Sequence, residues 1–542
     1  MRLKPEGLVW LGAIFYFVFN LGFLSSQYNF DGTVFSLNLE LVKSGASFGI
    51  LFHPRHLLYE PLGYCFWNLL LSVGIKIRAI LALQLFNLLL SSINLAIFAL
   101  NLMLLKPDKK WLGLFTGLGL GFGYAYWFLS LEPEVYILAI LILDITFYFM
   151  LRIIRREAQS IFYNFKTIIL TIFILSIFSA LMVFGHLMYS LFIIPILYFL
   201  LTIAWGEKKV NKIIPSILVI LISSIIILVV YDLAFRLNPL SGSGDNFQIE
   251  KFLKWVLGLA LPETPFGYRE SYWEISIRGP FLWILGLINS LVGEGEGNGW
   301  EAMVKIVFCL ISLTVLVNYF YRYFKIHYPS RFANNIIWLW LVPGALFTIF
   351  WEPGNYEHKI YLLPALWMMM FQGASFFSKS YLSYIFIGLL ICLLLVFNFS
   401  SKIYPNRKPE NNKNLQIAYY IKTKTEPNSV IIISGASQGF NIGKIYIPYF
   451  SERKTLVLDW VLSKPISEKL FPENLKIIIN SYFAQGKKIY WLSEIIEPAV
   501  LNQLSRHHNL SSEEISGFFR QFQLKPIGEI ETLKIYQLKN DQ

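Results

Sequence analysis

The sequence is dominated by apolar runs that are each about as long as a membrane span. A helix needs about 20 predominantly apolar residues to cross the hydrocarbon core of a bilayer. Hydrophobic residues make up 56% of the 542 residues and charged residues only 15%, whereas soluble domains carry about 25% charged residues. We therefore expect a polytopic α-helical integral membrane protein. Eleven runs reach or approach the required length, at 8–25, 79–105, 111–131, 134–151, 167–185, 187–205, 213–235, 301–321, 332–351, 359–377 and 381–400.

Two further apolar stretches, 58–75 and 278–293, are shorter, more aromatic, or interrupted by Gly and Pro. Basic residues in short loops mark the cytoplasmic side of a membrane protein. With the N-terminus in the cytoplasm, the basic loops fall on that side only if these two stretches do not cross. We expect both to be helices that lie at, or dip into, the outer face, which leaves Lys76 and Arg78 outside. The residues that this threading places in the cytoplasm are Lys106, Lys109, Lys110, Arg152, Arg155, Arg156, Lys208, Lys209, Lys212, Arg322, Lys325 and Arg331.

The net charge and the cysteines exclude other classes of protein. A net charge of +12 invites a nucleic-acid partner, but much of the basic charge lies in short loops, where it orients the spans. We therefore expect the lipid bilayer, and no nucleic acid, as a partner. Cys65, Cys309 and Cys392 show no CxxC spacing, so we expect neither a disulfide framework nor a zinc site. No small-residue cleavage pattern follows the first apolar run, so we expect no removable signal peptide.

The sequence changes character after residue 403. Short β-type runs alternate with helical patterns such as 472–485, which predicts a small α/β domain of about 130 residues. After eleven spans, this domain is expected to be extracytoplasmic. The predicted domains are a transmembrane domain, 1–403, whose first outer loop covers 26–78, and a soluble domain, 404–542. The predicted strands are 430–434, 455–458, 488–492 and 532–538.

Ionisable residues gather at the predicted outer ends of the spans. Such residues are costly at membrane depth and usually mark a functional site. They come from loops far apart in sequence, yet the threading brings them to one face, so we predict a reaction site there. The residues are Asp31, Glu40, His53, Arg55, His56, Glu60, Glu132, Glu134, His186, Glu352, Glu357, His358 and Lys359.

Several of these residues have both a structural and a functional interpretation. Asp31 precedes an amphipathic segment, where it suits a helix N-cap as well as a functional carboxylate. Glu134, in Leu-Glu-Pro-Glu-Val-Tyr, suits the positive end of a helix dipole. His53-Pro-Arg-His supplies donors of the kind that hold phosphate oxygens. His186, taken alone, fits a packing histidine better than a functional one, and Lys359 also suits reaching out of the bilayer along its aliphatic stem.

The order of these features resembles the GT-C class of membrane glycosyltransferases, and within it the bacterial protein-O-mannosyltransferase-like branch. The shared pattern is an Asp after the first span, His-Pro in a long first outer loop, and Glu-Val-Tyr at the start of a span. Gln84-Leu-Phe-Asn and Gly185-His186 add to it. The resemblance covers roughly the first 200 residues and, loosely, 350–365, but not the tail. A Pro or Gly commonly follows His-Pro in this branch, whereas Arg55 and His56 follow it here.

The resemblance implies an inverting transferase that uses a polyprenyl-phosphate-linked sugar and an acceptor protein, lipid or glycan. It places the enzyme in the bacterial inner (plasma) membrane. It implies Asp31 as the base that takes the acceptor proton and Glu134 as a second catalytic acid. Some members need a divalent metal, but we expect no metal and no other cofactor here. The residues implied to bind the lipid phosphate or sugar are His53, Arg55, His56, Glu132, His186, His358 and Lys359.

Two other functions remain open from the sequence. A transporter or flippase of a polyprenyl-linked lipid would carry charged residues near the bilayer midplane, with repeats or broken helices. A non-catalytic envelope assembly protein would use the tail to bind a partner. The gathering of charges at one face favours the transferase over both.

Overall fold

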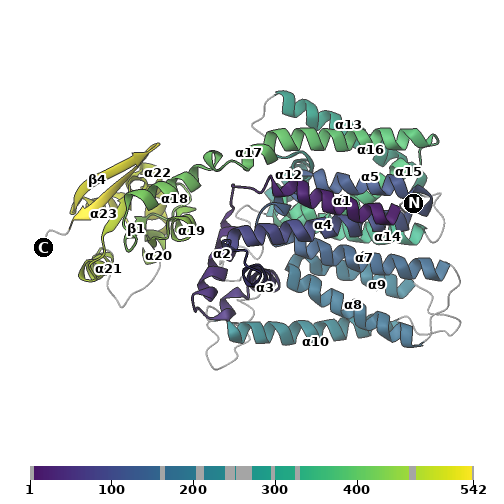
Figure 1. The fold of residues 1–542 in the computed structure, drawn as a ribbon, viewed down its shortest axis with the longest axis horizontal. Coiled ribbons are helices and arrows are strands. Elements are labelled where there is room, and N and C mark those ends of the chain that lie inside the picture. Colours follow the sequence, from purple (N-terminus) through teal and green to yellow (C-terminus); the bar gives the residue numbers. More distant parts are fainter. Residues whose placement is uncertain are drawn as a thin grey trace. The chain divides into compact units, whose positions relative to one another are not determined.

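The computed structural model describes residues 5–158, 165–202, 213–238, 251, 272–294, 299–323, 330–462, 472–508 and 510–539. The chain forms two compact units. The first consists of Met1–Ser25 and Asn38–Arg407, and the second of Ser26–Leu37 and Lys408–Gln542. The first unit is a bundle of helices, and the second contains a β-sheet (Figure 1).

Within the described residues, seven helices of the first unit are long and apolar enough to cross a membrane. They are α4 (Ala79–Leu105), α7 (Tyr136–Ala158), α8 (Phe165–Gly185), α10 (Ile213–Leu237), α13 (Gly299–Tyr323), α14 (Ser330–Trp351) and α16 (Ser380–Asn398). A bent pair, α5 (Lys110–Phe122) and α6 (Tyr124–Ser130), raises the number to eight if it forms one span. The predicted class, a helical membrane protein, is confirmed, whereas the predicted eleven spans are not.

The other helices of this unit are shorter or less apolar. They are α1 (Pro5–Leu21), α3 (Tyr59–Ser72), α9 (Ile193–Thr202), α12 (Tyr272–Val292), α15 (Leu363–Ser375) and α17 (Tyr404–Asn406). The 3₁₀ turns are η1 (Phe48–Leu51), η2 (Pro107–Lys109), η3 (Leu187–Phe192) and η5 (Glu357–Tyr361), and η6 (Phe399–Ile403) is a π-helical turn. Helix α2 (Phe30–Lys43) is shared by the two units.

Local breaks explain why three predicted spans differ from the structure. The run 111–131 bends by 70° between α5 and α6, where Gly123 has an extended backbone. The run 359–377 starts as the 3₁₀ turn η5, which leaves α15 with 13 residues, or about 20 Å of helix against a hydrocarbon core of about 30 Å. The run 187–205 divides into η3 and α9, and its last three residues lie outside the described residues.

The side chains on several helices face outward as they would toward lipid. In α10, Ile225, Leu228 and Val229 are each about 60% exposed. A face with so many large apolar side chains is unfavourable in water, whereas the hydrocarbon core of a bilayer accommodates it. By contrast, α4 is buried along most of its length, because it packs against α1, α5 and α7 (Figure 1).

The basic loops meet at one end of α4. Lys110 Nζ lies 2.6 Å from Glu6 Oε1, and Arg155 Nε and Nη2 donate to the carbonyls of Leu104 and Leu105 at 2.8 and 2.9 Å. These loops are the ones that the threading assigns to the cytoplasm. The predicted cytoplasmic residues Lys208, Lys209, Lys212 and Lys325 lie outside the described residues.

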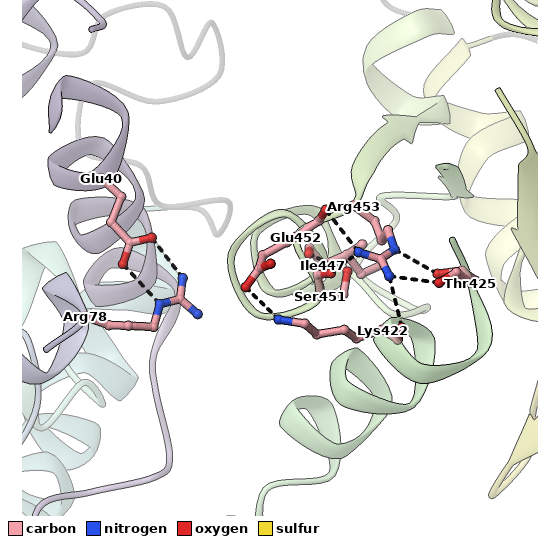
Figure 2. A network of polar contacts seen from close by, with 8 residues as sticks. All are labelled: Glu40, Arg78, Lys422, Thr425, Ile447, Ser451, Glu452 and Arg453. Atoms are coloured by element: carbon pink, nitrogen blue, oxygen red, sulfur yellow. Dashed lines mark hydrogen bonds and ion pairs between the residues drawn. The ribbon is translucent and has the colours of Figure 1, made fainter. Parts of the chain in front are cut away.

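The candidate site loops meet at the opposite end of α4. Near its start, Gln84 Nε2 donates to the carbonyls of Ser25 and Leu131 at 2.7 and 2.9 Å. Arg78, which the threading leaves at this end, forms a two-point ion pair with Glu40 (Figure 2), with Nε–Oε1 and Nη2–Oε2 distances of 3.1 and 2.9 Å. A paired guanidinium of this kind is compatible with the outer face, so it does not contradict the threading.

The sheet of the second unit has the strand order β2-β1-β3-β5-β4. Strands β1, β2 and β3 are parallel, and β5 pairs antiparallel with β3 and β4. The four predicted strands are present, and β4 was not predicted. The strands are β1 (Val430–Ile433), β2 (Lys454–Val457), β3 (Ile489–Leu492), β4 (Gln523–Ile530) and β5 (Leu533–Lys539).

Strand β4 escaped prediction because it is an edge strand with weak alternation. Pro526 lies within it, and its pairing register shifts between Pro526 and Gly528. Proline is confined to edges and bulges of sheets, so its presence argued against a strand. The helical elements of this unit are α18 (Lys413–Lys424), α19 (Gly443–Tyr446), α20 (Leu458–Leu462), α21 (Glu473–Ala484), α22 (Pro498–His508) and α23 (Ser512–Arg520), with η7 (Pro409–Asn411), η8 (Ile447–Ser451, a π-helical turn) and η9 (Ser493–Ile496).

Candidate active site

Three loops that are distant in sequence meet at the site end of the helical unit. The His53–His56 loop is tied to the end of α8, since Leu187 N donates to Arg55 O at 3.0 Å. The ring of Tyr136 lies 5.1 Å from that of His186 and 6.2 Å from that of His358. The loops around 53–56, 186 and 358 therefore form one cluster, which we call the basic cluster.

The His53–His56 loop is held in place by α10. Tyr231 Oη donates to Pro54 O at 2.7 Å, and Asn238 Nδ2 donates to Phe52 O at 2.9 Å. Within the loop, the imidazole rings of His53 and His56 stack with centroids 3.9 Å apart. The loop is thus a fixed platform, although it lacks the Pro or Gly expected after His-Pro.

The basic cluster is poorly solvated. Burial, followed by the nearby Arg55 charge, lowers the pKa of His53 to about 4. Burial lowers the pKa of His186 to about 3, with His358 and Arg55 adding to the effect. Burial also lowers the pKa of His56 and that of His358. The imidazoles are therefore neutral near pH 7.

Two side chains supply permanent or near-permanent positive charge. Arginine remains protonated in proteins, so Arg55 carries a charge. The Lys359 side chain is buried, its Nζ donates to Glu352 O at 3.2 Å, and burial lowers its pKa to about 8. A desolvated cluster with these two cations and several neutral imidazoles suits an anionic group.

Two buried carboxylates lie beside the basic cluster. Glu132 and Glu134 are 0% and 3% exposed. Asn87 Nδ2 donates to the backbone carbonyls of both residues, at 2.6 Å each, which fixes the loop between α6 and α7. Glu134 is two residues from Tyr136, which contacts the histidines. The acidic and basic parts of the site are therefore contiguous along the chain.

Tyr59 is associated with the carboxylates. It is fully buried at the start of α3, and burial, together with the charges of Glu134, Glu60 and Glu132, raises its pKa. Glu60 in turn accepts a hydrogen bond from Asn38 Nδ2 at 2.9 Å. The phenol is therefore a neutral donor beside three acids.

Asp31 lies in the second unit, in the first turn of α2, and is exposed. The N-cap interpretation of Asp31 is wrong, because Gly32 N donates to Asn29 Oδ1 at 2.7 Å. Asn29, which precedes the helix, is the residue that caps it. His186 does have a structural role, since its Nδ1 accepts from Met188 N at 3.2 Å and caps η3.

Sequence reasoning missed several residues of the site. Tyr136 belongs to the Glu-Val-Tyr motif, so its position was visible although its ring contacts were not. The ring of Tyr189 lies 5.9 Å from that of His186 and 5.0 Å from that of Tyr361. These two tyrosines therefore continue the ring contacts beyond His186. Asp144, in α7, is 0% exposed and lies beside the side chains of Asn94 and Asn101. A lone Asp inside the apolar run 134–151 was the signal for it.

In the described part of the chain, no group of three or more His, Cys, Asp or Glu side chains is placed to hold an ion.

Comparison with solved structures identifies the fold. The oligosaccharyltransferase of Archaeoglobus fulgidus, tethered with an acceptor peptide, aligns with 99% of this chain and 74% of its own, at 10% identity and a TM-score of 0.51. Archaeal AglB from A. fulgidus, in complex with an inhibitory peptide and a dolichol-phosphate, aligns over 96% and 72% at 10% identity and a TM-score of 0.50. ArnT from Cupriavidus metallidurans aligns over 98% and 96%, at 10% identity and a TM-score of 0.44.

The chain therefore has the fold of the GT-C class of membrane glycosyltransferases. The protein-O-mannosyltransferase-like branch is not confirmed. Neither a protein-family model nor a curated protein matches the sequence.

Proposed function

We propose that this protein is a membrane glycosyltransferase that moves a sugar from a polyprenyl-phosphate donor to an acceptor hydroxyl on the extracytoplasmic face. The observation that carries this proposal is the basic cluster itself. Three distant loops bring Arg55 and Lys359 together with four histidines in a partly buried site, beside the buried Glu132 and Glu134. The GT-C fold, and the dolichol-phosphate named with AglB, support a lipid-linked phosphate as the anion.

The chemistry assigned to the cluster is stabilisation of the leaving group. As the bond between the anomeric carbon and the phosphate oxygen breaks, negative charge grows on the departing polyprenyl phosphate. Arg55 and Lys359 meet this charge in a poorly solvated site, where each interaction is stronger than in water. The histidines donate hydrogen bonds to the same oxygens and can take up protons as the charge develops.

The base is proposed from the resemblance. The acceptor hydroxyl attacks the anomeric carbon from the face opposite the phosphate, which inverts the configuration of that carbon. Asp31 takes the proton of the attacking hydroxyl. Glu134 is proposed as a second acid that orients the acceptor or the donor, with Glu132 beside it. General-base help is worth about 10²–10⁴-fold in rate, so loss of the Asp31 carboxylate is expected to nearly silence turnover.

Asp144 favours a second candidate function, a transporter of a polyprenyl-linked lipid. A buried carboxyl within a span is a feature expected of a transport pathway. We rank this function second, because the basic cluster and the two buried glutamates gather at one end of the helical unit rather than along a path through it.

The test is sugar transfer by the purified protein in nanodiscs, with a panel of polyprenyl-phosphate sugars. Release of polyprenyl phosphate is followed for wild type, Asp31→Asn, Glu134→Gln and the exposed control Glu513→Gln, and each is checked for folding by thermal stability. Release by wild type and control, with loss in folded Asp31→Asn, supports the proposal. Equal release by Asp31→Asn removes Asp31 from the mechanism. No release from any donor, with lipid movement between leaflets, favours the transporter.

A further inference from the structure

The C-terminal domain holds the backbone on which Asp31 stands. Asn412 Nδ2 donates to Ser26 O at 2.7 Å, and the Tyr446 hydroxyl donates to Tyr28 O. The ring of Tyr28 stacks on that of Phe450, with centroids 5.2 Å apart. Three residues of the tail thus grip residues 26–28, only a few positions before the proposed base.

A cation–π contact holds the residue next to Asp31 as well. Lys444 Nζ lies 5.1 Å from the ring centroid of Phe30, in a cation–π arrangement. Asn412 is itself fixed, because its Oδ1 accepts from Leu415 N at 3.0 Å at the start of α18. Its Nδ2 also lies 3.2 Å from Tyr446 Oη, so the two donors form one unit.

The segment that carries Tyr446 and Phe450 is held by Arg453, which follows it in the sequence. Figure 2 shows Arg453 with its guanidinium directed at Thr425, Lys422 and the end of η8. Arg453 is 6% exposed and donates to Thr425 Oγ1 and O at 3.1 and 2.8 Å, to Lys422 O at 3.0 Å and to Ser451 O at 2.9 Å. Glu452 adopts a left-handed backbone (φ 58°) and pairs with Lys422 at 2.6 Å. A buried, fully bonded arginine at this point makes η8 a rigid support.

We propose that Asn412 and Tyr446 are positioning residues that make the C-terminal domain part of the transferase mechanism. They fix the carbonyls of Ser26 and Tyr28 and thereby set where the Asp31 carboxylate stands. This proposal rests on the proposed role of Asp31 as the base. A displacement of about 1 Å in a catalytic group costs about 10²-fold in rate, so two backbone contacts near Asp31 are enough to control turnover.

The proposal also gives the tail a function that the resemblance does not supply. A ligand or protein that displaces η8 or α19 would release residues 26–30 and slow transfer, without touching the donor.

Two substitutions remove the contacts with little change in shape. Tyr446→Phe deletes only the hydroxyl that reaches Tyr28 O. Asn412→Asp keeps the oxygen that caps α18 and loses the nitrogen that reaches Ser26 O. The matched control is Tyr420→Phe, which deletes a hydroxyl in the same domain that accepts from Glu529 N at 3.1 Å.

The experiment combines amide hydrogen exchange with steady-state kinetics on the full chain in nanodiscs. We expect both variants to speed exchange in peptides covering 26–37 by about tenfold, with strands β1 and β3 unchanged. We expect kcat to fall by about 10²-fold while KM for the donor stays within about twofold, and the control to match wild type.

The outcomes separate this proposal from the proposed function. An active wild type, with variants whose exchange or kcat equals that of wild type, overturns positioning and leaves the transferase intact. A wild type that transfers no sugar overturns the transferase and, with it, the role of Asp31. A parallel rise in KM and fall in kcat, or a lowered melting temperature with general loss of exchange protection, also overturns positioning, since both indicate a merely structural role.

Discussion

The imidazole rings of His53 and His56 stack 3.9 Å apart, with planes 10° from parallel. Two imidazolium ions at this distance would repel each other strongly, and burial already lowers the pKa of both rings. The empty cluster therefore keeps its histidines neutral, and an incoming phosphate changes that balance.

We predict that donor binding takes up protons. An anion next to His53 or His186 raises a pKa that is about 4 or 3 in the empty site, so the bound state holds more protons than the empty state. Affinity then rises as pH falls from about 7 toward these values. Titration calorimetry in two buffers of different ionisation enthalpy measures the uptake. A polyprenyl-phosphate sugar is the suitable ligand, because its phosphodiester has no second proton. Proton release, or no buffer dependence, would refute this account of the histidines.

Lys359 predicts a second pH effect, at the alkaline end. Its pKa in the empty site is about 8, and a bound phosphate raises it. The contribution of Lys359 to donor affinity is therefore full below about pH 8 and is lost as pH rises above it. Lys359→Arg keeps the charge at all these pH values, so its affinity should stay level between pH 8 and 10. A wild type whose affinity is equally level there would contradict this role of Lys359.

Asn87 is predicted to matter beyond its effect on stability. Its side chain donates to the carbonyls of Glu132 and Glu134, and Asn87→Leu removes this donor from both buried carbonyls. Such a loss costs about 1–3 kcal/mol per group, so the melting temperature should fall. Because the same loop carries Glu134, kcat/KM should fall in the protein that remains folded. Ser92→Ala, five residues farther along α4, is the control, and unchanged kcat/KM in folded Asn87→Leu would count against the site.

The C-terminal domain carries its own pH signature at Glu494. This carboxyl is 2% exposed and bonds to Ser434 N and Oγ at 2.7 and 2.5 Å. Burial, the largest effect, raises its pKa from 4.5 to about 7. The folded domain holds a proton that the unfolded chain releases, so stability is full below about pH 4.5 and is lost as pH rises through about 7. The loss is about 3 kcal/mol. Thermal melts from pH 5 to 8 should show this slope, and Glu494→Gln should flatten it. An equal slope in both proteins would exclude Glu494 as its source.

The sequence predicted what depends on local pattern. Apolar length located the spans, and β-type runs located β1, β2, β3 and β5. The bend at Gly123, the 3₁₀ start at Glu357 and the edge strand around Pro526 all depend on tertiary packing, so the local pattern misled there.

For the candidate site, the boundary charges indicated which loops to expect together. His53, His186 and His358 do lie in one cluster. Ionisable side chains are costly at membrane depth, so they gather at a shared polar site. No local sequence pattern indicated the ring contacts of Tyr136 or the hydrogen bond from Tyr446 to the carbonyl of Tyr28. They join positions that are far apart in sequence, and only the folded chain brings them together.

We propose that the basic cluster stabilises the lipid phosphate as it leaves the sugar. The most direct test is single-turnover sugar transfer by wild type, Arg55→Gln and the exposed control Lys413→Gln, with bound donor measured separately. The account predicts transfer by wild type and control, and a loss of about 10²–10³-fold in the chemical step for Arg55→Gln. Equal single-turnover rates in all three proteins would contradict it.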